Sequence, residues 1–223
     1  MRILKITLVS VIASILMVLP SNALEKRIGV ALAMTGISGE GTETLKDSGA
    51  KHTTNASDQA VIGSIFLELA GDRGFGLGLE HVPGSADINS GTRSKTNNKL
   101  GTDDSGTNTA SAEIDGLTSI YLIKTFDSGV FVKIGQTSTT VNTKEVLSTG
   151  SKYDNEDVDG MVLGLGINRS KDSGFFYRIS GEVTDYDSIT LNSKTADADT
   201  GKKNKIVADI DTVAFKLSIG KAF

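Results

Sequence analysis

Apolar and polar residues alternate at every second position along most of this chain. Near the start, Ile28, Val30 and Leu32 are separated by single glycine or alanine residues. A period of two is that of a β-strand with two unlike faces, and the chain beyond residue 26 has no clear helical period. The alternation predicts eight strands, at residues 26–35, 59–70, 75–82, 113–124, 129–141, 161–168, 175–186 and 212–223.

The connections between these strands alternate between long and short. The long ones are rich in Ser, Thr, Asn, Asp, Gly and Lys, a composition typical of solvated loops. They cover residues 39–58, 83–112, 142–159 and 187–206. The short ones each contain Asp, then Arg or Ser, then Gly, and we expect that glycine to take the left-handed conformation of a tight hairpin. They are residues 71–75, 126–130 and 171–175.

This arrangement predicts an all-β fold, an eight-stranded antiparallel up-and-down barrel. An open sheet of this size would expose two strand edges to other chains, and closure into a barrel removes both edges. We expect residues 24–223 to form this single barrel domain.

The first 23 residues have the pattern of a secretory signal peptide. Arg2 and Lys5 are followed by a uniformly apolar stretch at residues 6–19, and small residues, Ser21 and Ala23, stand where a signal peptidase reads. We expect cleavage after Ala23 and export. A membrane anchor is the alternative, but the apolar stretch is short and has no basic residues directly behind it.

The alternation alone does not distinguish a soluble barrel, apolar inside, from a membrane barrel, apolar outside. The other face of the strands decides between them, because Gly29, Gly76, Gly78, Gly164 and Gly166 lie on it. Glycine suits the crowded interior of a narrow barrel, whereas a face in water would carry Thr, Lys and Glu. Together with the signal peptide, this favours a transmembrane barrel with its apolar face in lipid.

The chain resembles the small eight-stranded outer-membrane barrels of Gram-negative bacteria, the OmpA-barrel, OmpX and opacity-protein type, over residues 24–223. The terminal strand resembles the signal that the barrel-assembly machinery of these bacteria selects, with Lys221 as a departure. That signal comprises Phe215, Leu217, Ile219 and Phe223. The resemblance implies the cell outer membrane as location. It implies the assembly machinery, outer-membrane lipid and lipopolysaccharide as partners, and an external ligand for the loops.

Aromatic residues gather near the short turns, and we expect them to form one girdle at the membrane interface. They are Phe66, Phe75, Phe126, Phe131, Phe175, Phe176, Tyr177 and Phe223. The opposite rim offers only Tyr153 and Tyr186.

Three acidic and three basic residues fall on the interior face when the alternation is extended. They are Glu68, Glu80, Lys133, Arg178, Glu182 and Lys216. An eight-stranded barrel has an interior just wide enough for side chains to fill. One hypothesis is a plug of ion pairs, since an unpaired buried charge costs several kcal/mol. The other is a gated pore in which the pairs rearrange.

Composition excludes several classes of function. With 0 Cys and only His52 and His81 as histidines, a cysteine-ligated or multi-histidine metal centre is excluded. A net charge of −4 gives no footprint for nucleic acid. Residues 155–160 are similar to the start of a calcium loop, but Gly166 stands where the bidentate glutamate belongs. We predict no cofactor, no resident metal and no catalytic residues. Acidic pairs at 103–104, 197–199 and 209–211 leave open divalent ions that bridge to lipopolysaccharide.

Three functions remain open. The first is a non-enzymatic structural or surface-interaction protein that acts through four long external loops. The second is a narrow porin-like pore for small solutes. The third is a lipid- or peptide-processing enzyme with a site at the loop rim, where the two histidines would be the candidate bases.

Overall fold

The computed structural model describes residues 24–44, 49, 51–95, 106–146, 152–195 and 202–223. The predicted signal peptide, residues 1–23, and its cleavage site lie outside the described residues and stay a prediction. No helix in the described part of the chain is long and apolar enough to cross a membrane. The strands are β1 (Glu25–Thr44), β2 (Lys51–Ala70), β3 (Phe75–His81), β4 (Ser85–Lys95), β5 (Gly106–Thr125), β6 (Val130–Val146), β7 (Glu156–Ser170), β8 (Phe175–Tyr186), β9 (Ile189–Asn192) and β10 (Lys205–Ala222).

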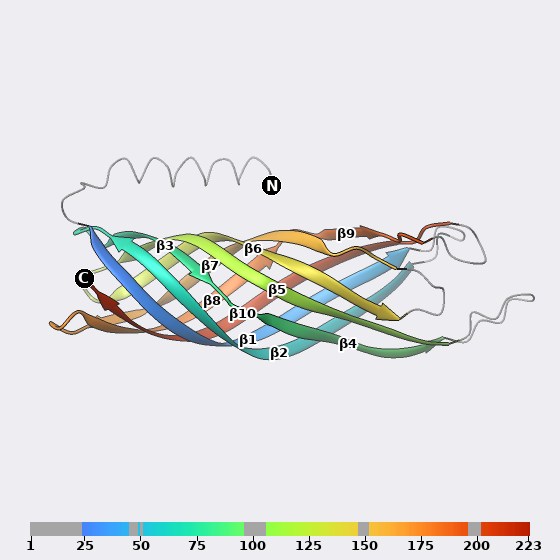
Figure 1. The fold of residues 1–223 in the computed structure, drawn as a ribbon, viewed down its shortest axis with the longest axis horizontal. Coiled ribbons are helices and arrows are strands. Elements are labelled where there is room, and N and C mark those ends of the chain that lie inside the picture. Colours follow the sequence, from blue (N-terminus) through green and yellow to red (C-terminus); the bar gives the residue numbers. More distant parts are fainter. Residues whose placement is uncertain (1–23, 45–48, 50, 96–105, 147–151, 196–201) are drawn as a thin grey trace, which may run out of the picture.

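The strands form one antiparallel sheet that closes on itself (Figure 1). Each long strand pairs with its sequence neighbours, and β1 pairs with β10 along its whole length, from Arg27↔Ala222 to Thr44↔Lys205. Two of the eight barrel strands are interrupted. One consists of β3 and β4, which both pair with β5, and the other consists of β8 and β9, which both pair with β10. The predicted fold class, an eight-stranded antiparallel up-and-down barrel, is confirmed.

Apolar side chains cover the outer face of the barrel nearest the short turns. Met34 is 64% exposed and Leu165 60%, and their neighbours two positions away are similar. The alternate positions of the same strands are buried, as the pattern of β1 and β8 shows. We call this outer band the apolar belt. The predicted orientation, apolar outside, is therefore confirmed.

The three short turns are built alike. In each, the glycine has positive φ (75° at Gly74, 84° at Gly129, 83° at Gly174) and its N–H donates to the residue three positions earlier. The carbonyl of the same glycine accepts a hydrogen bond from the following strand of the sheet, for example from Thr125 N at 2.8 Å. The predicted left-handed glycine is thus confirmed at all three turns.

The long polar segments are predicted as loops, and that prediction is wrong for most of residues 39–58 and 83–112 and for the ends of the other two segments. β1 continues to Thr44, β2 begins at Lys51, and β10 begins at Lys205. Polar residues at 155–160 belong largely to β7 and not to a calcium-type loop. Strand pairing that begins within the apolar belt continues beyond it. There the outer face no longer contacts lipid, so the strands can consist of polar residues and lack the alternating pattern.

The predicted aromatic girdle is wrong for three of its members. Phe66, Phe131 and Phe176 are buried inside the barrel, because they lie at even spacing from Glu68, Lys133 and Arg178 on the inward face. Phe75, Phe126, Phe175, Tyr177 and Phe223 are exposed on the outside, as expected. Both residues proposed for the second rim, Tyr153 and Tyr186, are also buried inside.

Inward glycines make room for these rings. A Cβ on Gly166 would lie 2.7 Å from the Phe131 ring. Added Cβ atoms on Gly29, Gly78 and Gly220 would overlap the rings of Phe66, Tyr121 and Phe176 in the same way. The glycines of the inward face therefore fit the narrow interior that the sequence predicted for them.

Candidate functional site: the barrel lumen

All six charged residues that the alternation placed inside lie in the lumen, and they come from five strands. They belong to β2 (Glu68), β3 (Glu80), β6 (Lys133), β8 (Arg178 and Glu182) and β10 (Lys216), so only β8 contributes two. Counting residues from the turns predicts similar depths for them. Their contacts form two groups, one of four residues and one of two.

Four of these residues form a quartet of alternating charge. Lys133 Nζ lies 2.9 Å from Glu80 Oε2 and 3.0 Å from Glu182 Oε2. Lys216 Nζ lies 2.7 Å from Glu80 Oε1 and 2.9 Å from Glu182 Oε2. The Ser64 hydroxyl also donates to Glu80 at 2.6 Å. Each carboxylate therefore accepts from two ammonium groups, and the quartet has no net charge.

The other pair, Glu68 and Arg178, is bidentate. Arg178 Nη1 and Nη2 donate to the two carboxylate oxygens at 2.5 and 2.7 Å, and Nε donates to Asn168 Oδ1 at 3.0 Å. Two planar groups joined by parallel hydrogen bonds make one of the strongest ion-pair geometries in proteins. The Glu68 side chain has no exposed surface and that of Arg178 is 6% exposed, so the pair is fully inside.

Aromatic rings surround this pair, and they are not among the residues predicted from the sequence to line the lumen. The Arg178 guanidinium carbon lies 4.8 Å from the Phe176 ring centre, 5.5 Å from Phe131 and 5.7 Å from Phe66. These cation–π contacts are strongest in a site that excludes water. The signal was available, because each phenylalanine stands two positions from a predicted interior charge.

Tyr121 links the two groups. Its hydroxyl donates to Glu68 at 2.8 Å, while Lys133 Nζ lies 4.4 Å from its ring centre. Arg27, a further residue that the sequence analysis did not place inside, approaches Glu68 at 3.9 Å. The six charges and their neighbours thus form one connected layer across the lumen, which we call the charge layer.

Little space is left within the charge layer. The cavity lined by these residues has a volume of about 20 Å³, room for roughly one water molecule. Among the described residues, Thr125 Oγ1 is the only buried side-chain polar atom without a hydrogen bond. The buried charges are therefore compensated by one another and not by a column of water.

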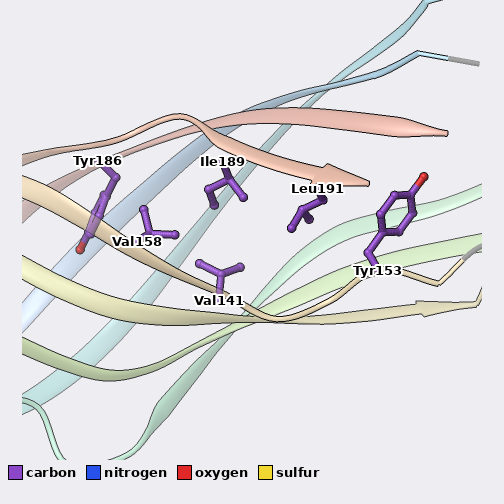
Figure 2. Close-up of a cluster of buried hydrophobic side chains, with 6 residues drawn as sticks. All are labelled: Val141, Tyr153, Val158, Tyr186, Ile189 and Leu191. Atoms are coloured by element: carbon purple, nitrogen blue, oxygen red, sulfur yellow. The ribbon is translucent and has the colours of Figure 1, made fainter. Parts of the chain in front are cut away.

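Beyond the charge layer, toward the long connections, the lumen contains a cluster of buried apolar side chains. Figure 2 shows the buried side chains following one another along the barrel, from Tyr186 to Tyr153. They are Val141, Tyr153, Val158, Tyr186, Ile189 and Leu191, with Ala112, Leu117, Ile206, Ala208 and Ile210 packed against them. The strand neighbours that point outward here, Thr140, Asp157 and Asp185, are polar and exposed or partly exposed. We call this part of the barrel, between the charge layer and the long connections, the upper barrel. Its apolar cluster faces inward and these polar side chains face outward, which is the reverse of the arrangement in the apolar belt.

Between β2 and β4 the barrel wall has no strand pairing. Strand β2 pairs with β3 only from Ile65 to Ala70, and within the described residues β4 pairs with β5 alone. Toward the long connections, β4 runs away from β2 (Figure 1). The break between β3 and β4 falls at Pro83, which has no N–H, and Gly84, whose φ is 109°.

The seam begins at the depth of the apolar belt. Gly63 and Val61 of β2 stand beside Leu32 and Met34 of β1, whose side chains face lipid. No water is present in a bilayer core to satisfy open strand edges, so such edges occur there only where protein or a cavity covers them. We define the seam as the gap in pairing between β2 from Lys51 to Ser64 and β4.

Comparison with known proteins agrees with this architecture. No protein-family model and no curated protein matches the sequence. Among solved structures, the crystal structure of the outer membrane protein OprG from Pseudomonas aeruginosa matches with a TM-score of 0.65 at 14% identity, over 90% of this chain and 96% of that one. The chain has the fold of the small eight-stranded outer-membrane barrels. With its apolar belt, this fold confirms the predicted location in the outer membrane of Gram-negative bacteria.

Two other solved structures are more distant. The solid-state NMR structure of AlkL matches with a TM-score of 0.49 at 10% identity, over 92% of each chain. The outer membrane protease OmpT from Escherichia coli matches with a TM-score of 0.42 at 8% identity, over 89% of this chain and 97% of that one. A shared fold does not fix a function, so the role of this chain has to be argued from its own lumen and surface.

The remaining sequence-predicted residues lie outside the charge layer. Phe215, Leu217, Ile219 and Phe223, the predicted assembly signal, all face outward on β10. His81 Nδ1 lies 2.9 Å from Thr118 Oγ1 at the outer face, and the backbone of His52 is in β2 opposite Glu43 and not in a loop. No group of three potential metal ligands occurs in the described part of the chain. The acidic pairs at 103–104 and 197–199 lie outside that part.

Proposed function

We propose that this barrel is a non-enzymatic outer-membrane protein that does not conduct ions or small polar solutes and acts at its long-connection end. The observation that carries this proposal is the charge layer. Two lysines and two glutamates from four strands are paired within 3.0 Å around a cavity of about 20 Å³. A conducting pore needs charges that stay hydrated, and these charges instead contact one another.

The apolar lumen beyond this layer supports the same proposal. A column of water that passed the charges would next meet Val141, Val158 and Ile189, which are all buried. Apolar constrictions of a pore block ions by excluding water. Two successive barriers of opposite chemistry therefore stand between the two ends of the barrel.

Proteoliposome swelling tests the proposal. Liposomes that contain the refolded protein are diluted into isotonic glycine or arabinose, and the expected rate of swelling equals that of protein-free liposomes. A matched variant, Lys133→Ala with Glu182→Ala, removes one pair and should swell faster if the charge layer is the barrier. Rapid swelling with the unchanged protein would contradict the proposal and favour the porin-like pore.

The seam favours a second candidate function, the binding of a small apolar molecule in the upper lumen and its passage into the lipid. This candidate needs an apolar cavity wall and an opening at membrane depth. The buried cluster from Tyr186 to Tyr153 supplies an apolar surface, and the edge of β2 beside Val61, which is not paired with β4, is where such a molecule would pass. Such a molecule would not have to cross the charge layer.

Binding of the apolar fluorophore N-phenylnaphthylamine to detergent-solubilised protein tests this candidate. Leu191→Gln places an amide in the apolar lumen and should weaken binding several-fold, since burying an unpaired amide costs about 1–3 kcal/mol. Thr190→Gln, the adjacent and outward-facing position of β9, is the matched control and should leave binding unchanged. Equal binding by both variants would reject the upper lumen as the site.

A further inference from the structure

The outer face of the barrel carries a basic border at the short-turn end of the apolar belt. On this border the strands turn Lys26, Lys124, Arg169 and Lys221 outward. At the other border, the first charged residues on four strands are acidic: Glu40, Asp159, Asp185 and Asp211. The outward strand residues named here are therefore basic at one border of the apolar belt and acidic at the other.

Two of the lysines lie over pairs of phenylalanine rings. Lys124 Nζ is 4.3 Å from the ring centre of Phe75 and 5.7 Å from that of Phe126. Lys221 Nζ is 4.7 Å from Phe175 and 5.8 Å from Phe223. These phenylalanines are 46–74% exposed on the outer surface. We call the two lysines and four rings the basic–aromatic collar.

Lys26 adds a third positive charge next to the collar. Its backbone pairs with that of Phe223 through hydrogen bonds of 2.9 and 3.3 Å, so β1 brings it beside Lys221 and its rings. Arg169 stands opposite Tyr177 on the neighbouring pair of strands. The Arg169 guanidinium donates to the backbone carbonyls of Ser128 and Asn168, so the contact of a cation with exposed rings is made by Lys124 and Lys221.

The lysine charges of the border are not neutralised by the protein. Within the described residues, neither Lys124 nor Lys221 has a carboxylate at ion-pair distance, although Lys124 Nζ does donate to the Arg73 carbonyl. The ring faces hold each ammonium against the surface at the level where lipid headgroups begin. An anion supplied from the membrane would complete these sites.

We propose that the basic–aromatic collar binds the phosphate groups of anionic phospholipids in the leaflet nearest the short turns. The phosphodiester would accept hydrogen bonds from Lys124 or Lys221, and the acyl chains would lie along the apolar belt directly above, for example on Leu77 or Ile219. A zwitterionic lipid offers the same phosphate but carries a compensating cation, which the collar repels. This proposal does not depend on whether the lumen conducts.

Native mass spectrometry of the full barrel in detergent tests the proposal. The folded protein is incubated with equimolar phosphatidylglycerol and phosphatidylcholine, and retained lipids of each kind are counted. The parent should prefer phosphatidylglycerol, and Lys124→Gln with Lys221→Gln should lower that preference by roughly fivefold for each lysine, from the value of about 1 kcal/mol per basic residue at an anionic surface. Lys124→Arg with Lys221→Arg keeps the charges and should keep the preference.

Lys144→Gln is the matched control, because it removes an exposed lysine that is paired with Asp87 and Glu113 far from the collar. Heat-modifiable migration verifies that each variant is folded, and single Lys→Gln variants replace the double one if it is not. The proposal is overturned if the parent shows no preference, if the double variant keeps the preference, or if Lys144→Gln lowers it equally.

Discussion

Arg178 is a permanently charged group in the interior of a membrane-embedded barrel. Its guanidinium is compensated by Glu68, Asn168 and three phenylalanine rings, at the distances given above. Since arginine cannot lose its charge, any change that removes Glu68 leaves a cation in a space without room for hydration. The stability of this layer is therefore a property of pairs and not of single residues.

A double-mutant cycle on Glu68 and Arg178 measures this coupling. Each single change, Glu68→Leu or Arg178→Leu, should lower the free energy of unfolding by about 3–5 kcal/mol, because it leaves the other charge buried and unpaired. The double variant should lower the free energy of unfolding much less. Urea unfolding in lipid vesicles gives the three values. Lys144→Ala, which breaks an exposed ion pair, is the control and should cost about 0–1 kcal/mol. Additive losses in the double variant would show that the two side chains act independently.

At the residue scale, the sequence identified which side chains face inward but not which ones meet. The period of two assigns Glu68, Lys133 and Arg178 to the interior directly. Their partners depend on strand tilt, which pairs Arg178 with a residue 110 positions away and not with Glu182 on its own strand. The same alternation places Phe66 and Phe176 inside, whereas their position near the turns alone predicts a place in the outer girdle.

Single strands change the phase of their apolar residues where they leave the membrane. On β10, Val213 and Phe215 face outward, whereas Ile206, Ala208 and Ile210 face inward. On β7, Leu163 and Leu165 face outward, whereas Val158 faces inward. The switch marks the height at which the solvent around the barrel changes from lipid to water. Each strand therefore carries the position of the membrane border in its own sequence.

Amide hydrogen exchange tests the unpaired seam. Every second N–H of β2 from Lys51 to Gly63 points toward β4 and should exchange much faster than the amides of β1, which pairs with β2 and β10 on both edges. NMR of the protein in detergent micelles resolves the individual positions. Uniform protection of β2 would mean that the seam is closed by hydrogen bonds in solution.

Strand existence was readable from the sequence, but strand length was not. The alternation ends near the membrane border, so a segment such as 39–58 has the composition of a loop. The structure extends β1 to Thr44 and β2 from Lys51, because a ladder begun in the belt adds polar pairs at little cost. Similarly, the sequence predicts that a strand ends just before Pro83, but it does not predict that the chain continues as the strand β4 directly after it.

At the scale of the whole molecule, β10 closes the ring, because it pairs with both β1 and β8. Its four outward apolar residues, Phe215, Leu217, Ile219 and Phe223, stay a predicted signal for assembly. Deleting Phe223 should lower the amount of folded protein in the outer membrane of producing cells, measured by heat-modifiable migration. Replacing Phe126, an exposed ring at another turn, with alanine is the control. Equal yields for the deletion and the parent would contradict the assembly role.

Export makes a separate prediction for the mature chain. Cleavage after Ala23 should give a protein whose first residue is Leu24, so that the barrel begins directly with β1 at Glu25. Intact-mass and N-terminal sequencing of protein from outer-membrane fractions decides this. A mature protein that retains residues 6–19 would show that the apolar stretch is an anchor.

The central claim is that paired charges and the apolar cluster close the lumen to ions, and planar-bilayer recording tests it most directly. We expect no discrete current steps above those of the bare bilayer when the purified protein is inserted into membranes bathed in concentrated salt solution. Lys133→Ala with Glu182→Ala serves as the comparison that weakens the charge layer. Steady ohmic steps with the unchanged protein, with an ion preference that shifts on Lys133→Ala, would contradict the claim and establish a pore.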